Sequence, residues 1–196
     1  MLSPEERATL ALDMLHHVLD VIAQSGEISS AAVISPDAAN LDLPSGVTHL
    51  AEIKAGLNNV LYQGKQWAIE SGVDRLLVIL GDLPFLAPQD ITEMVNLAGA
   101  SNNTVVLAPD RHRIGTNVLL VQPVSLARFA FGTHSYSVHL GIYAKAGAQV
   151  KTYTSPGTSL DMDTPFDITF LEGTGLDSFI NVPSLRTDMF MNESTE

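Results

Sequence analysis

A chain of 196 residues, 45% of them hydrophobic, is long enough to bury one sizeable core, and this composition excludes a collagen-like, coiled-coil or disordered protein. The formal net charge of −12 opposes nonspecific contact with polyanionic nucleic acid. There is no cysteine for disulfides or thiolate zinc sites, and no apolar run approaches the roughly 18 residues of a membrane span, so we expect a cytoplasmic protein without membrane contact.

The first predicted element is an amphipathic helix that begins after Ser3. Ser3 can cap this helix, and Glu6 completes a capping box with it. Short strands are predicted over residues 31–35 and 47–50 because these runs are apolar and a turn-rich segment separates them. A second helix is expected to open at Gly56.

The rest of the chain alternates apolar strands with helices. Strands are predicted over residues 76–80, 104–108, 116–121 and 149–154, and helices over 88–97, over 135–146 with Ser135 as the cap, and from Thr164 onward. This alternation predicts an α/β fold with a three-layer, mostly parallel sheet. Because the periodicity fades from Gly173, we expect one domain over residues 1–172 and a loosely ordered tail over residues 173–196.

Carboxylates follow two of the predicted strands. Asp82 comes directly after the strand at 76–80, and Asp161 and Asp163 follow the strand at 149–154. If these strands are neighbours, the three side chains converge at the carboxyl edge of the sheet, where open α/β folds bind ligands and where carboxylates suit Mg²⁺. The alternative is local: Asp163 caps the helix that follows, and Asp82 is a turn residue before Pro84.

A basic segment lies between the strands at 104–108 and 116–121. Arg111 and Arg113 supply positive charge, Gly115 supplies flexibility, and Thr116 offers a hydroxyl group. This combination suits an anionic substrate in a protein that is otherwise acidic. A solvated loop without a ligand is the alternative.

Two glycine turns precede predicted helices. Gly132 and Ser135 lie at the start of the helix at 135–146, whose amino end favours a phosphate or carboxylate. Gly56, Leu57 and Asn58 open an earlier helix and suit a nearby base, ribose or phosphate. Ordinary helix starts without a ligand are the alternative for both turns.

Seven short segments, taken in order along the chain, resemble the guanylyltransferases of coenzyme F420 biosynthesis. They are Leu2 to Arg7, Gly56-Leu57-Asn58, Gly81 to Pro84, Ala108 to Arg111, Gly115 to Asn117, Phe131-Gly132 with Ser135 and His139, and Leu160 to Pro165. Each segment alone is common, so the resemblance depends on their order, and it extends to about residue 172.

The resemblance implies a nucleotidyltransferase fold related to the GT-A glycosyltransferases. It implies an enzyme that joins GTP to a small phosphorylated three-carbon acid, either phosphoenolpyruvate or 2-phospho-L-lactate, and releases pyrophosphate. It also implies Mg²⁺ bound through Asp82, Asp161 and Asp163. Thr116, Gly132 and Ser135 are expected to hold the acceptor, Arg111 or Arg113 to orient it, and the turn at Gly56, Leu57 and Asn58 to lie near the guanosine.

The chain departs from the family pattern at its amino end. Members of the family carry a first strand and a basic, nucleotide-contacting loop before the helix that begins with Ser3-Pro4-Glu5, whereas this chain begins at that helix. We therefore expect exposed strand edges, which favour a homodimer, and hypothesise a truncated amino-terminal sequence.

Two other functions remain open at this point. One is another nucleotidyl or glycosyl transfer on the same scaffold, such as guanylylation of molybdopterin or of a sugar phosphate. The other is a noncatalytic nucleotide-binding module, which would bind GTP without releasing pyrophosphate.

Overall fold

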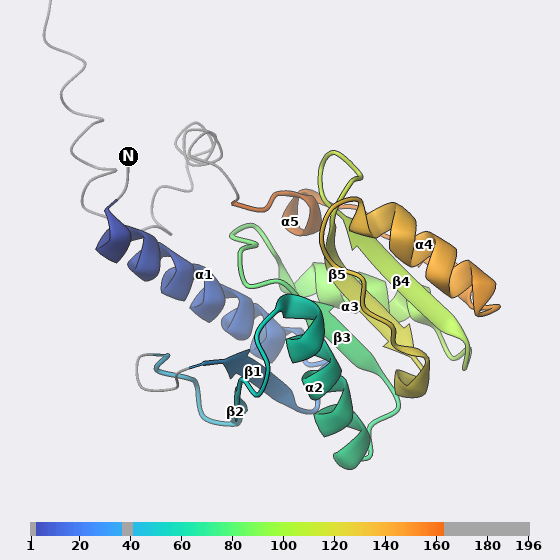
Figure 1. Cartoon of the computed structure of the whole chain (residues 1–196), viewed down its shortest axis with the longest axis horizontal. Coiled ribbons are helices and arrows are strands. Elements are labelled where there is room, and N and C mark those ends of the chain that lie inside the picture. Colours follow the sequence, from blue (N-terminus) through green and yellow to red (C-terminus); the bar gives the residue numbers. More distant parts are fainter. Residues whose placement is uncertain (1–2, 37–40, 163–196) are drawn as a thin grey trace, which may run out of the picture.

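A computed structural model of the chain describes residues 3–36 and 41–162, and its elements follow the expected alternation (Figure 1). The elements are α1 Pro4–Ser25, β1 Ala31–Ser35, β2 Val47–Ala51, α2 Leu57–Glu70, β3 Leu76–Ile79, α3 Pro88–Ala98, β4 Thr104–Pro109, β5 Thr116–Gln122, the 3-10 helix η1 Val124–Leu126, α4 Ser135–Lys145, β6 Gln149–Thr152 and α5 Pro156–Ser159. The helix predicted from Thr164 and the tail predicted over 173–196 lie outside the described residues.

The capping box predicted at the start of α1 is present. The backbone N–H of Glu6 donates to Oγ of Ser3 at 3.2 Å, and the N–H of Ser3 donates to Oε2 of Glu6 at 2.7 Å. The helix ends at Gly26, whose φ of 69° is a left-handed conformation that glycine adopts without strain. None of the helices in the described part of the chain is long and apolar enough to cross a membrane.

The main sheet has four strands in the order β3-β5-β4-β6. β4 and β6 pair in parallel, while β5 is antiparallel to both β3 and β4. Three strands therefore run in one direction and β5 alone is reversed, because the short connection over residues 110–115 cannot return the chain to the other end of the sheet. The expected mostly parallel direction is confirmed, with β5 as the exception.

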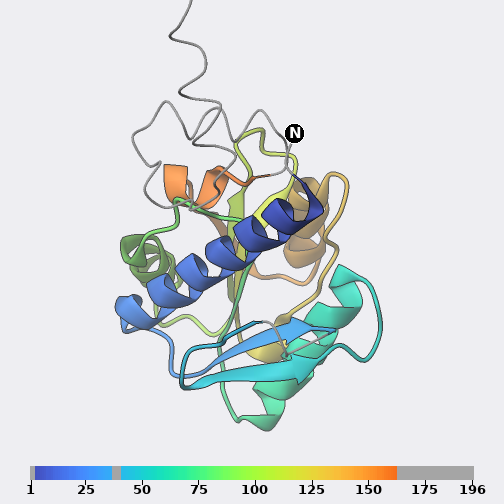
Figure 2. The same ribbon diagram turned by 90° about the vertical axis from the view of Figure 1, so that its left-hand side faces the viewer.

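The three layers meet in two apolar clusters on opposite faces of the sheet. Val106 and Leu120 face α1 and α3, whereas Val105 and Leu119 face Tyr143 of α4 and the segment that precedes that helix. Figure 2 shows the sheet nearly edge-on between α3 on one side and α2 and α4 on the other. β4 and β5 are buried along their whole length, as strands covered on both faces should be.

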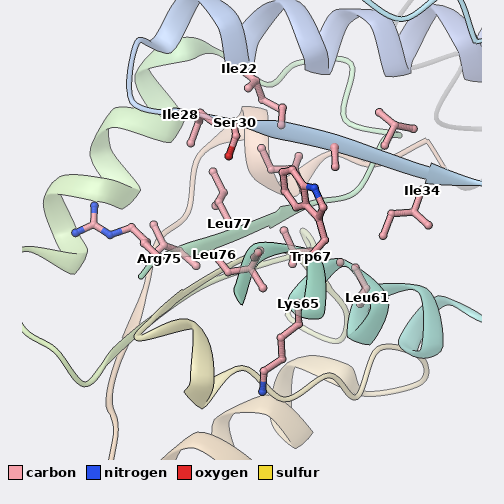
Figure 3. A pocket seen from close by; sticks show the side chains of 18 of the residues that line it. Ile22, Ile28, Ser30, Ile34, Leu61, Lys65, Trp67, Arg75, Leu76 and Leu77 are labelled. Carbon is pink, nitrogen blue, oxygen red and sulfur yellow. The ribbon is translucent and has the colours of Figure 1, made fainter. Parts of the chain in front are cut away.

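β1 and β2 form a separate parallel pair. Within the described residues, β1 pairs only with β2 and β3 only with β5, so each keeps one edge without a neighbouring strand. β1 and β3 line an apolar cavity of about 700 Å³, which lies between Ile22 of α1 and Trp67 of α2 (Figure 3). The free strand edges expected from the sequence are therefore present, and they face this cavity.

The end of the chain that is described differs from the sequence prediction in one respect. β6 stops at Thr152, and the short helix α5 follows, capped by Ser155, whose Oγ accepts the backbone N–H of Thr158 at 3.1 Å. The predicted strand to residue 154 is thus too long, because Ser155 and Pro156 start a helix there.

Candidate functional site

The two described carboxylate segments lie against each other. Asp82 follows β3 and Asp161 follows α5, and the backbone N–H of Met162 donates to the carbonyl oxygen of Asp82 at 3.2 Å. Asp163, the next residue, lies outside the described part. Within that part no three His, Asp or Glu side chains form a group that would hold a metal ion, so a shared metal stays a prediction. An all-carboxylate donor set on adjoining segments fits Mg²⁺.

Asp110 organises the basic loop, a role that the sequence analysis missed. Its Oδ1 accepts the N–H of Ile114 at 2.9 Å, and its Oδ2 accepts that of Gly115 at 2.7 Å. A Cβ on Gly115 would lie 2.9 Å from Oδ2 of Asp110, so a larger residue there would displace this carboxylate. An aspartate shortly before a glycine between two strands is the signal that predicts such a turn.

The two predicted arginines contact different elements of the fold. The Nη2 atom of Arg113 donates to the hydroxyl of Tyr136 at 3.0 Å, and its guanidinium lies 5.3 Å from the centre of the Tyr136 ring. The backbone N–H of Arg111 donates to the carbonyl of Ser159 at 2.8 Å. Arg113 is thus fixed beside the start of α4, and Arg111 lies beside the segment that leads to Asp161. Both side chains are exposed and offer local positive charge to an anion.

Thr116 contacts His139, which lies on the same helix as Ser135. Nδ1 of His139 lies 3.0 Å from Oγ1 of Thr116, and Nε2 lies 3.0 Å from the backbone nitrogen of Ala130. Ser135 precedes His139 by one turn of α4. Thr116 and Ser135 are each 2% exposed, whereas the turn at residues 132–134 before α4 is exposed.

The prediction that Ser135 caps α4 is wrong. The N-cap residue is His134, with φ 58°, and Ser135 is the first helical residue. The N–H of Ser135 donates to the carbonyl of Gly132 at 3.0 Å, and the N–H of Tyr136 donates to that of Ile114 at 3.0 Å. Backbone carbonyls satisfy these two amides, so the helix start needs no side-chain cap.

The predicted nucleotide turn adjoins the predicted acceptor loop. Oδ1 of Asn58 accepts the N–H of Phe131 at 2.8 Å, and Nδ2 of Asn58 donates to the Phe131 carbonyl at 3.0 Å. Gly56 has φ 105°, a glycine conformation, and Leu57 is 45% exposed. Asn58 therefore places Gly132 next to the start of α2, although its own amide is already occupied. That it contacts guanosine stays a prediction.

Burial lowers the pKa of His139 from 6.5 to about 4. Its ring is fully buried and packs edge-on against Phe131, with the two ring centres 4.9 Å apart. In the unfolded chain this imidazole binds a proton below about pH 6.5, whereas in the folded chain it does so only below about pH 4. This imidazole therefore contributes stability that is present above pH 6.5 and lost as the pH falls toward 4.

We expect the free energy of unfolding of the wild type to fall by about 3 kcal/mol between pH 6.5 and 4 because of this group alone. Urea unfolding across this range checks the prediction. The His139→Asn variant should show a shallower decrease, whereas His134→Ala, which removes an exposed imidazole nearby, should keep the wild-type slope. Equal slopes in all three proteins would contradict it.

Comparison with known proteins identifies relatives of this chain. A family model described as "Guanylyl transferase CofC like" matches residues 1–196. A phosphoenolpyruvate guanylyltransferase of Rubrobacter xylanophilus is 35% identical, with 89% of this chain and 85% of that protein covered. A phosphoenolpyruvate guanylyltransferase of Sphaerobacter thermophilus is 33% identical, with 88% and 83% covered.

Solved structures share the fold. A putative nucleotide-diphospho-sugar transferase from Desulfovibrio desulfuricans superposes with a TM-score of 0.70 at 15% identity, covering 94% of this chain and 83% of that one. A 2-C-methyl-D-erythritol 4-phosphate cytidylyltransferase from Thermus thermophilus gives a TM-score of 0.55 at 16% identity, covering 82% and 87%. The predicted nucleotidyltransferase fold is confirmed.

Proposed function

Because this chain belongs to the family of CofC-like guanylyl transferases, we propose that it joins the guanylyl group of GTP to phosphoenolpyruvate and releases pyrophosphate, as a step of coenzyme F420 biosynthesis. The observation that carries the proposal is the match to relatives named phosphoenolpyruvate guanylyltransferase, which extends over 89% and 88% of this chain. The adjoining segments of Asp82 and Asp161, and of Asn58 and Phe131, support it because they bring the predicted sites to neighbouring places in the fold.

In the proposed reaction an oxygen of the acceptor's phosphate attacks the α-phosphorus of GTP. A bond forms between that oxygen and the α-phosphorus, and the bond from the α-phosphorus to the bridging oxygen of the β-phosphate breaks, so that pyrophosphate leaves. The attacking oxygen is already anionic, and no side chain needs to act as nucleophile or base. The protein's task is to hold two anions in line and to offset their charge.

The residues divide this task between them. Asp82, Asp161 and Asp163 would hold Mg²⁺, which when bound supplies positive charge to the phosphate oxygens. Thr116, Gly132 and Ser135 bind the acceptor, and Arg111 and Arg113 orient its charged groups. The turn at Gly56, Leu57 and Asn58 lies beside the guanosine. Location in the cytoplasm and a homodimeric state stay predictions from the sequence.

A pyrophosphate-release assay with mass detection of the product tests the proposal. With GTP and Mg²⁺ we expect the highest kcat/KM for phosphoenolpyruvate, a lower value for 2-phospho-L-lactate and 3-phosphoglycerate, and little turnover when ATP or CTP replaces GTP. If 2-phospho-L-lactate is the best acceptor, the enzyme is a guanylyltransferase with a different acceptor from the one proposed here. Binding of GTP without pyrophosphate release would instead indicate a noncatalytic nucleotide-binding module.

A further inference from the structure

The hydrogen bonds of His139 define which of its two ring nitrogens carries the proton. A backbone N–H can only donate, so Nε2, which lies 3.0 Å from the nitrogen of Ala130, must be the acceptor. A neutral imidazole has a single N–H, which is then on Nδ1. That N–H donates to Oγ1 of Thr116, at 3.0 Å.

This arrangement leaves the proton of the Thr116 hydroxyl available. The oxygen of Thr116 accepts from His139, and a hydroxyl has one proton of its own to donate. Among the groups of residues 3–36 and 41–162, none accepts that proton. Because Thr116 is 2% exposed, bulk water does not randomise the orientation of the hydroxyl.

His139 also connects the other residues assigned to the acceptor. It lies one helical turn after Ser135 on α4, and its bond to Ala130 holds the segment that runs through Phe131 to Gly132. Its ring packs against that of Phe131, whose backbone is bound by the side chain of Asn58. A change at His139 therefore reaches the acceptor residues directly.

We propose that His139 is a positioning residue: it holds the Thr116 hydroxyl with its proton directed toward an anionic oxygen, a carboxylate or phosphate oxygen of the three-carbon acceptor. This inference rests on the proposed function, since it names the ligand of the same site. His139 itself takes no proton from the substrate and does not contact it. Its contribution is to acceptor binding and not to the chemical step.

Two conservative variants distinguish the roles of the two ring nitrogens of His139. Asparagine places its side-chain N–H near the position of Nδ1, and glutamine reaches the position of Nε2 but offers nothing near Nδ1. His139→Gln should raise the KM for phosphoenolpyruvate roughly tenfold, with kcat and the KM for GTP within about twofold of wild type. His139→Asn should keep the acceptor KM within about twofold to threefold, because it still donates to Thr116.

The same substitutions in a Thr116→Val background test whether His139 acts through Thr116. Thr116→Val alone should raise the acceptor KM roughly tenfold or more, and adding His139→Gln should cause no further increase. If the two increases in acceptor KM multiply in the double variant, His139 does not act through Thr116. An equal increase in acceptor KM in the His139→Asn and His139→Gln variants would likewise overturn the inference in favour of a purely structural role.

A measurement on the wild type does not depend on any variant folding. Long-range proton–nitrogen NMR correlations of the His139 ring should show Nδ1 protonated and Nε2 unprotonated at neutral pH. The reverse tautomer would overturn the inference even in an active enzyme. A wild type that releases no pyrophosphate with any acceptor would instead overturn the proposed function, and with it the ligand named here.

Discussion

Asp82→Asn is expected to reduce kcat/KM for guanylyl transfer by roughly 10²–10³-fold without lowering the stability of the fold. The substitution keeps the size of the side chain and removes its charge, so the proposed Mg²⁺ site would lose a ligand while the packing is retained. Asp161→Asn and Asp163→Asn should have similar effects, because each removes one carboxylate of the same proposed set. Pyrophosphate release measured at several Mg²⁺ concentrations checks the prediction, and part of the loss should be recovered at high Mg²⁺.

A matched control is available at the other end of the same strand. Asp74 is exposed just before β3, whereas Asp82 follows it, so Asp74→Asn removes the same charge far from the proposed site. We expect this variant to keep wild-type kinetics. Unchanged turnover in Asp82→Asn, or an equal loss in Asp74→Asn, would show that the carboxylate after β3 does not serve the reaction.

Gly157→Ala is expected to destabilise the protein by about 3 kcal/mol. An added Cβ would lie 2.7 Å from the carbonyl oxygen of Phe85 and would clash with Oδ2 of Asp90. Asp90 cannot easily move away, since its carboxylate accepts the N–H of Ala87 at 2.8 Å and the hydroxyl of Tyr153 at 3.0 Å. Urea unfolding should show the loss as a lower midpoint with little change in slope.

Gly141→Ala is the control for this prediction. Gly141 lies inside α4, and a Cβ there meets nothing within 4 Å. Alanine should therefore stabilise the helix by about 0.5–1 kcal/mol, because it restricts the unfolded chain more than glycine does. A Gly157→Ala variant as stable as wild type would mean that α5 does not pack tightly against Asp90 and Phe85.

Local signals in the sequence were sufficient for most elements of this fold. The capping box at Ser3 and Glu6 specifies the start of α1, and the unbroken apolar run at 104–108 specifies a strand covered on both faces. The capping of α4 was predicted incorrectly because a carbonyl distant in the sequence, that of Ile114, supplies a partner that local reasoning does not see. The reversed direction of β5 likewise follows from the connection before it and not from its own residues.

The candidate site was predictable in residue type but not in geometry. The sequence located the strand before Asp82 but not the helix α5 that precedes Asp161, and β3 and β6, whose adjacency the prediction assumed, lie at opposite edges of the main sheet. A backbone hydrogen bond from Met162 to Asp82 nevertheless brings the two segments together. The contact between Asn58 and Phe131 spans 73 positions of the chain, so no local pattern encodes it. His139 illustrates the same limit, because its partner Thr116 lies on another element and its role depends on which nitrogen faces the hydroxyl.

The cavity between β1 and β3 lies between two parts of the fold that we expect to differ in their free energy of local unfolding. No backbone ladder joins the β1–β2 pair to the main sheet in the described residues, so the connection depends on packing against the helices and on side-chain bonds such as that from Nε2 of Gln63 to the Ala51 carbonyl. Local opening of the β1–β2 pair should therefore require less free energy than global unfolding, whereas β4 and β5 should exchange their amides last. The turn leading to Gly56 follows β2 and belongs to the more easily opened part, while Thr116 lies on the most protected strand. If Thr116 holds the acceptor and Gly56 adjoins the nucleotide, as proposed, the acceptor would bind on the part that opens last and the nucleotide beside the part that opens first.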